Sequence, residues 1–68
     1  MTYEYFFTKQ PPRRDAYPHT TNLIGTNTFA MKTFIRKINQ EAYGAVFYTA
    51  PLTEQQIKAY TLVKGGKW

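Results

Sequence analysis

The sequence lacks cysteine and serine altogether and contains a single histidine, His19. Without cysteine the chain cannot form disulfides or thiolate zinc sites, and one imidazole cannot build a histidine metal cluster. Cysteine and serine are also the commonest catalytic nucleophiles. The acidic residues are few, and no two stand at a spacing that indicates a catalytic carboxylate pair: Glu4, Asp15, Glu41 and Glu54. We therefore expect a protein that is not an enzyme and that needs no metal or cofactor.

Long apolar runs are missing as well. No segment approaches the ~18 consecutive apolar residues of a membrane-spanning helix. The first residues also lack the charged and apolar regions that make up a signal peptide. We expect a cytoplasmic protein that has no membrane association.

The length of the chain limits the fold to one small domain, residues 1–68. A chain of this size buries only about 60% of its unfolded surface, so its core alone is marginally stabilising. The sequence holds six tyrosines, five phenylalanines and one tryptophan, more than a disordered polar chain carries. We expect a compact fold that is stabilised by aromatic packing, with a homodimer as a further source of stability.

The charge is unbalanced, because nine basic and four acidic residues give a formal net charge of +5. Such an excess on a small domain favours a polyanionic partner, which can be nucleic acid or an acidic protein surface. The alternative is that the net charge only keeps a small protein soluble.

Two segments have the composition of β-strands. Tyr3–Lys9 alternates aromatic side chains between two faces, and the prolines that follow it end the strand. Residues 10–19 are polar and predict a loop, after which a short strand at 20–25 can pair back on the first strand as a wide hairpin. Gly44–Ala50 contains strand-forming residues and is ended by Pro51.

The segment of about 28–41 has helical spacing. Apolar side chains recur there at i, i+3, i+4 and i+7, which is the pattern of an amphipathic helix: Met31, Phe34, Ile35 and Ile38. Gly44 would end this helix in a left-handed conformation. The sequence therefore predicts an α+β domain in which one amphipathic helix packs on a two- or three-stranded sheet.

A short C-terminal helix at about 54–62 has a nearly complete start signal. Thr53 and Gln56 have the spacing of a capping box, and Leu52 and Ile57 occupy the positions of a hydrophobic staple. The alternative is a further strand over 57–63, because several residues there tolerate β structure. Residues 64–68 predict a flexible tail.

Candidate binding residues are basic and aromatic. On the predicted helix, Lys32 and Arg36 lie one turn apart on the exposed side, next to Phe29. This ring could stack on a base while the cations hold phosphates; alternatively, the face is merely solvated and Phe29 turns inward. Arg13 and Arg14 form a second basic spot in the loop, either for the same polyanion or simply as part of a mobile loop.

A second candidate surface is the first strand, where Tyr3, Tyr5 and Phe7 share one face. If the small domain leaves this face uncovered, it would bind a protein or form a homodimer. If both faces of the strand are covered internally, no such surface exists.

Residues 42–63 read AYGAVFYTAPLTEQQIKAYTLV. This stretch resembles small accessory modules of phages and conjugative elements, in which a glycine-started strand ends in Pro-Leu-Thr and a short helix ends in Tyr-x-Leu. The positions that carry the resemblance are Pro51, Leu52, Thr53, Tyr60 and Leu62. Related modules often have arginine before the proline and glutamate before the leucine, where this chain has Ala50 and Thr61. The resemblance implies a bacterial or mobile-element accessory protein that acts by binding, and it carries over no functional residue.

These observations lead to a non-enzymatic bacterial or mobile-element interaction module that binds a polyanion, either nucleic acid or an acidic protein surface. The alternative is a protein-binding or self-associating module that uses the aromatic strand, with the net charge incidental.

Overall fold

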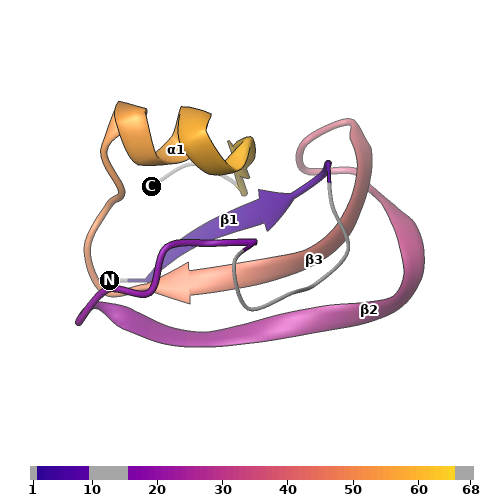
Figure 1. The fold of residues 1–68 in the computed structure, drawn as a ribbon. Helices are drawn as coiled ribbons and strands as arrows, with labels where there is room; N and C mark the ends of the chain where they lie inside the picture. The colour runs from indigo at the N-terminus through magenta and orange to yellow at the C-terminus, as the bar shows by residue number, and fades with distance from the viewer. Residues whose placement is uncertain (1, 10–15, 66–68) are drawn as a thin grey trace.

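The fold is seen in a computed structural model that describes residues 2–9 and 16–65. The described residues form β1 (Tyr3–Phe7), β2 (Leu23–Ile35), β3 (Gln40–Tyr48), α1 (Glu54–Tyr60) and β4 (Leu62–Lys64). The strands make one antiparallel sheet in the order β2-β3-β1-β4, and α1 lies over one face of it (Figure 1). The α+β class is confirmed, although the sheet has more strands and the chain has less helix than the sequence predicts. No helix in this part of the chain is long and apolar enough to cross a membrane.

The alternation predicted for the first strand is confirmed in β1. Tyr5 and Phe7 are fully buried on the face that α1 covers, and Phe6 is buried on the opposite face. β1 pairs with β3 on one side and with β4 on the other. β1 therefore lies in the middle of the sheet and contributes to a core on each face.

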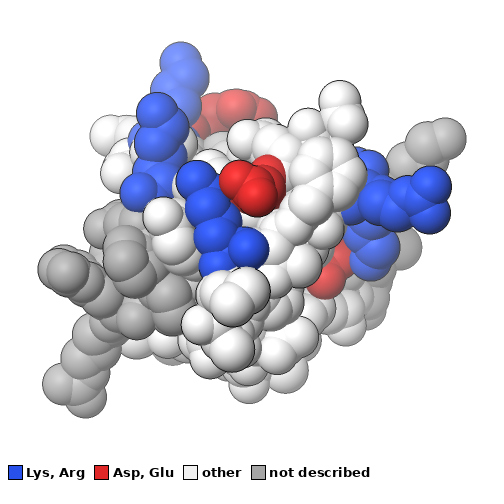
Figure 2. Space-filling view, turned by 90° about the vertical axis from the view of Figure 1, so that its right-hand side faces the viewer, with Lys and Arg blue, Asp and Glu red and all other residues white. Residues whose placement is uncertain are grey.

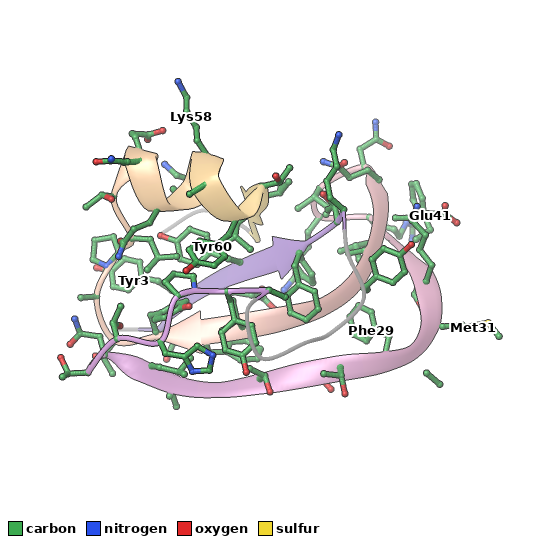
Figure 3. The ribbon with its side chains drawn as sticks, in the orientation of Figure 1. Tyr3, Phe29, Met31, Glu41, Lys58 and Tyr60 are labelled. Carbon is green, nitrogen blue, oxygen red and sulfur yellow. The ribbon has the colours of Figure 1, made fainter. Side chains whose placement is uncertain are left out.

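The first core lies under α1. It consists of Tyr5, Phe7, Val46, Tyr48 and Leu62. The rings of Tyr5 and Tyr48 meet edge to face, with centroids 5.9 Å apart, and the stacked ring of Tyr17 lies 6.1 Å from that of Phe7. From α1, Ile57 and Tyr60 pack onto this core, and Figure 3 shows Tyr60 pointing from the helix toward the sheet. Burial of each large side chain stabilises the fold by roughly 1.5–3 kcal/mol.

Two phenol groups of this core hold separate segments in place. The Tyr48 hydroxyl donates a hydrogen bond of 2.7 Å to the carbonyl of Pro18. The Leu52 backbone N–H donates one of 2.9 Å to the Tyr5 hydroxyl. One tyrosine thus fixes the segment before β2, and the other fixes the turn that leads into α1.

The second core lies on the opposite face of the sheet and is smaller. Phe6, Ala42 and Ala45 are buried there, and Phe29, Ile35, Ile38 and Phe47 pack against them. The turn between β2 and β3 contributes to its cover, since the Lys37 ammonium lies 3.1 Å from the Glu4 carboxylate of β1. The end of the β2–β3 hairpin is thereby attached to the body of the molecule.

The start of α1 is as predicted. The Gln56 backbone N–H donates to the Thr53 hydroxyl at 3.1 Å, and the Thr53 N–H donates to the Gln56 side-chain oxygen at 3.0 Å, which completes the capping box. The helix ends at Tyr60, before the predicted end at about 62. Thr61 adopts a left-handed conformation with a φ of 52°, and Leu62 then enters the sheet opposite Phe7.

The helix predicted over about 28–41 is wrong. These residues form most of β2, the turn at 36–39 and the start of β3. β-branched and aromatic residues are frequent in β2 and fit a pleated strand. Asn39 turns the chain with a φ of 54°, a left-handed conformation that asparagine tolerates. The strand predicted at 20–25 begins only at Leu23, and it pairs with β3 rather than with β1.

Gly44 does not end a helix; it lies within β3 between Phe7 and Thr28 of the neighbouring strands. A Cβ atom at this position would lie 2.5 Å from the Phe7 ring and 2.8 Å from the Asn27 carbonyl oxygen. Glycine is therefore required by the close approach of a buried ring.

Candidate nucleic-acid interface on the β2–β3 hairpin

The distal half of the β2–β3 hairpin is set off from the rest of the sheet by an irregularity in β2. Thr28 pairs with Gly44, but the next pair along the hairpin is Thr33 with Ala42. Residues 29–32 of β2 therefore face only Tyr43. Such an excess of residues on one strand bends that strand, and Figure 1 shows β2 curving as it approaches the turn.

Beyond this bend the hairpin presents two different faces. Ile35 and Ala42 turn toward the core around Phe6. Phe34 and Glu41 pair directly with each other, and both are exposed. Opposite residues of an antiparallel pair share a face. The distal half of the hairpin therefore has one face that packs against the core around Phe6 and one face that is exposed.

Lys32 belongs to the exposed face. Its ammonium lies 5.3 Å from the centroid of the Tyr43 ring on the neighbouring strand. A cation over an aromatic ring at an exposed site contributes about 0.5–1 kcal/mol. We call Lys32, Phe34, Glu41 and Tyr43 the outer hairpin face. Tyr43 is its half-buried member and packs against the first core.

Two further cations lie in the turn that follows. The Lys37 ammonium pairs with Glu4, an exposed interaction worth about 0–1 kcal/mol whose main effect is to position the turn. Arg36 is exposed and makes no ion pair with another described residue. The distal hairpin thus carries Lys32, Arg36 and Lys37 within six residues of chain.

The structure separates the residues that the sequence grouped together for polyanion binding. Lys32 and Arg36 both lie on the exposed distal hairpin, although on a strand and a turn rather than on a helix. Phe29 is half-buried and packs against the core around Phe6, and Figure 3 shows it on the inner side of the curve of β2. Arg13 and Arg14 lie outside the described residues.

Two apolar side chains that the sequence analysis assigned to the packed stripe of a helix are exposed in this region. Met31 is 75% exposed and Phe34 is 55% exposed. Figure 3 shows Met31 and Glu41 both pointing away from the body of the molecule. The sequence did contain a signal for Phe34, because Lys32, Phe34 and Arg36 are each two residues apart. This spacing places the three side chains on one face only if the segment is a strand.

The alternative aromatic surface is located in the core. Tyr5 and Phe7 are fully buried under α1, and Tyr3 is half-buried against the same cluster. Figure 3 shows Tyr3 beneath the start of the helix. The face that these three residues share is therefore covered within the molecule.

Basic side chains lie at several places on the hairpin side of the molecule. Figure 2 views the molecule from the right-hand side of Figure 1, the side on which β2 curves. Lysine and arginine side chains stand next to each other at the left and the centre of this view, and an acidic side chain lies against the central one. Further basic side chains stand at the right, beyond a stretch of uncharged side chains. Such an arrangement offers separate points of contact to an extended anion.

The titratable groups of the core have structural roles. Burial raises the pKa of the Tyr48 phenol, and neighbouring tyrosines reinforce the effect. Burial also raises the pKa of the Tyr5 phenol, although the hydrogen bond from Leu52 opposes this. Within residues 2–9 and 16–65, no group of three or more potential ligands could hold a metal ion.

The chain was compared with protein families, curated proteins and solved structures. A family model described as Defence against restriction A C-terminal matches residues 1–67. No curated protein and no solved structure gives a significant match.

Proposed function

The chain belongs to the Defence against restriction A C-terminal family, and from this premise we propose that it binds nucleic acid through the β2–β3 hairpin. Membership makes it an accessory module associated with phages or mobile elements and related to defence, in agreement with the resemblance of residues 42–63. Restriction is directed at DNA, and this favours nucleic acid over an acidic protein surface as the polyanion. We place this action in the cytoplasm of a bacterium.

The arrangement of charge on the distal hairpin carries the proposal. Lys32 and Arg36 are exposed on the distal half of one hairpin, and the whole chain has a net charge of +5. A two-stranded β-ribbon fits the major groove of B-DNA, and cations that neutralise phosphates release counterions and so supply affinity. The curved hairpin provides such a ribbon, with its covered face on the body and its outer face free to meet a ligand.

The proposed activity is binding without catalysis. The chain has no serine or cysteine nucleophile. The buried phenols of Tyr5 and Tyr48 have hydrogen-bonding partners within the core. These features support an interaction module that requires no cofactor.

The test is fluorescence anisotropy of labelled duplex DNA and single-stranded RNA, titrated at low and near-physiological salt. We expect saturable binding that weakens steeply with salt. The double variant Lys32→Glu, Arg36→Glu should abolish binding and keep the fold, as judged by urea unfolding.

The matched control is Lys9→Glu, Lys58→Glu, which changes the net charge equally at exposed cations outside the hairpin. Figure 3 shows Lys58 on α1 pointing away from the sheet. Unchanged affinity in the hairpin variant, or an equal loss in the control, would exclude the hairpin as the binding site.

A second candidate function is protein binding or self-association through the edge of β2. β2 is an outer strand of the sheet, and the exposed large apolar side chains of the described residues all lie on it: Ile24, Met31 and Phe34. Edge strands offer free backbone groups to a further strand. This surface replaces the buried aromatic face as the candidate for a homodimer.

Sedimentation equilibrium at low and high salt tests the second candidate. Apolar association should persist or strengthen at high salt, and Ile24→Lys should weaken it. A monomer under all conditions would exclude self-association.

A further inference from the structure

Phe34 is an aromatic residue that the fold turns outward. Its neighbour Ile35 packs toward the core around Phe6, so strand alternation directs the Phe34 ring to the opposite face. The side chain is 55% exposed, and none of the described ring pairs includes it. More than half of Phe34 is therefore accessible to a ligand.

Cations flank this ring along the chain. Lys32 precedes it by two residues, and its ammonium is positioned over Tyr43 on the outer hairpin face. Arg36 follows it by two residues in the exposed turn. An aromatic side chain between two cations is the combination that proteins use for single strands, where bases stack on rings and cations track the backbone.

We propose that the outer hairpin face prefers single-stranded nucleic acid, with Phe34 as the stacking residue. This inference rests on the proposed function, because Lys32 and Arg36 supply the phosphate contacts. Bases in a duplex already have neighbours on both faces, whereas an unpaired base is free to stack on a side chain. The ring of Phe34 therefore adds affinity for a single strand only, while the cations add affinity for both forms.

The deciding experiment compares a labelled oligodeoxythymidylate with a duplex of the same length, at one low salt concentration. Stacking on an aromatic side chain is worth about 1–3 kcal/mol per base. Phe34→Leu keeps an apolar side chain but removes the ring, and we expect it to weaken single-strand binding about tenfold. Duplex affinity should stay within about twofold, and Phe34→Tyr should restore single-strand affinity because it restores the ring.

Met31→Ala is the matched control, because Met31 is more exposed than Phe34 and lies on the same strand. Its removal should leave single-strand affinity nearly unchanged. If Met31→Ala and Phe34→Leu weaken binding equally, general apolar contact explains the effect and the stacking role is wrong.

The remaining outcomes separate this inference from the proposed function. If Phe34→Leu changes neither probe while Lys32→Glu, Arg36→Glu weakens both, the hairpin binds the backbone and the preference for single strands is wrong. If Phe34→Leu weakens duplex binding as much as single-strand binding, the ring acts as a wedge between base pairs instead. If the unaltered protein binds neither probe, the proposed function itself fails.

Discussion

Tyr5 and Tyr48 link the sheet to segments that are distant in sequence. Each phenol is buried, and each has its oxygen in a hydrogen bond with a backbone group, of Leu52 and Pro18 respectively. Burial disfavours the charged phenolate and raises the pKa of both groups. In the unfolded chain the same groups titrate near their ordinary pKa of about 10.

These raised pKa values predict a loss of stability in alkali. Below the unfolded pKa of about 10, both states hold the phenolic proton and stability does not depend on it. As the pH rises above that value, the unfolded chain loses the proton first. The free energy of unfolding should then fall by up to about 1.4 kcal/mol per pH unit for each tyrosine.

Urea unfolding at a series of pH values from about 8 to 11 measures this dependence. In Tyr48→Phe the fall should be shallower, because one of the two groups is gone. That variant should also be less stable at neutral pH by roughly 1–3 kcal/mol, since the Pro18 carbonyl loses its donor. A urea midpoint that does not change across the pH series would contradict the predicted link between phenol ionisation and stability.

Gly44 gives a second prediction for a single residue. A Cβ atom there would collide with the buried Phe7 ring and the Asn27 carbonyl, so Gly44→Ala should destabilise the protein by about 1–3 kcal/mol. Gly25→Ala is the control, because no atom lies within 4 Å of its added Cβ. Chemical denaturation should show little change for Gly25→Ala. An equal effect of the two substitutions would mean that the ring moves aside at Gly44.

Among the elements, α1 depends on its cap more than most helices do. It has seven residues, and none of them is fully buried. Helices this short are unstable in isolation. The reciprocal bonds of Thr53 and Gln56 satisfy backbone donors that would otherwise be exposed at its start.

Thr53→Ala should therefore cost about 1 kcal/mol of stability, within the range of about 0.5–2 kcal/mol for loss of an N-cap. Thermal unfolding followed by circular dichroism measures the effect. Gln55→Ala, at an exposed position of the same helix, should leave stability nearly unchanged. If Thr53→Ala is as stable as Gln55→Ala, packing of Ile57 and Tyr60 alone maintains the helix.

The elements also show which structure the sequence could predict. β1, β3 and the start of α1 follow from local signals, namely aromatic alternation, strand-forming residues and the capping box. β2 could not be recognised in this way, because its apolar residues match a helical spacing by coincidence. Met31 and Phe34 of that pattern are exposed in the structure, while Ile35 and Ile38 pack against the core around Phe6. Only pairing with β3 decides between the two conformations.

The same limit applies to the candidate site. Lys32 and Arg36 could be selected from the sequence because cations near an aromatic residue favour a polyanion. Phe29 was chosen as the aromatic residue beside these cations because a helix was predicted. On the strand that the structure shows, the exposed aromatic residue between them is Phe34. The involvement of Arg13 and Arg14 stays a prediction.

For the molecule as a whole, the family match over residues 1–67 includes both the body of the sheet and the hairpin. Phe29, Ile35 and Ala42 of the hairpin contribute to the core around Phe6. Lys32, Phe34 and Glu41 of the outer hairpin face are exposed and belong to neither core. The hairpin is anchored at its base by the pairing of β3 with β1 and at its end by the ion pair of Lys37 with Glu4. The fold therefore holds the proposed binding surface in place, although the exposed residues of that surface do not belong to either core.

A substitution at Glu41 can distinguish the effect of the net charge on binding from the effect of charges close to the hairpin. This carboxylate lies opposite Phe34 on the outer hairpin face and points away from the body (Figure 3). If nucleic acid binds here as we propose, Glu41 should repel its phosphate backbone, and Lys32 and Arg36 should attract it. At a separation of about 7 Å in water the repulsion is about 0.6 kcal/mol, so Glu41→Gln should strengthen binding roughly threefold.

Glu54→Gln on α1 makes the same change in net charge at a distance from the hairpin, and it should have a smaller effect because salt screens charges beyond about 8–10 Å. Anisotropy titrations of both variants at low and high salt provide the measurement, and the difference between them should disappear at high salt. Equal gains in affinity would show that only the net charge of the molecule attracts nucleic acid. A gain confined to Glu41→Gln would place the bound backbone along the outer hairpin face.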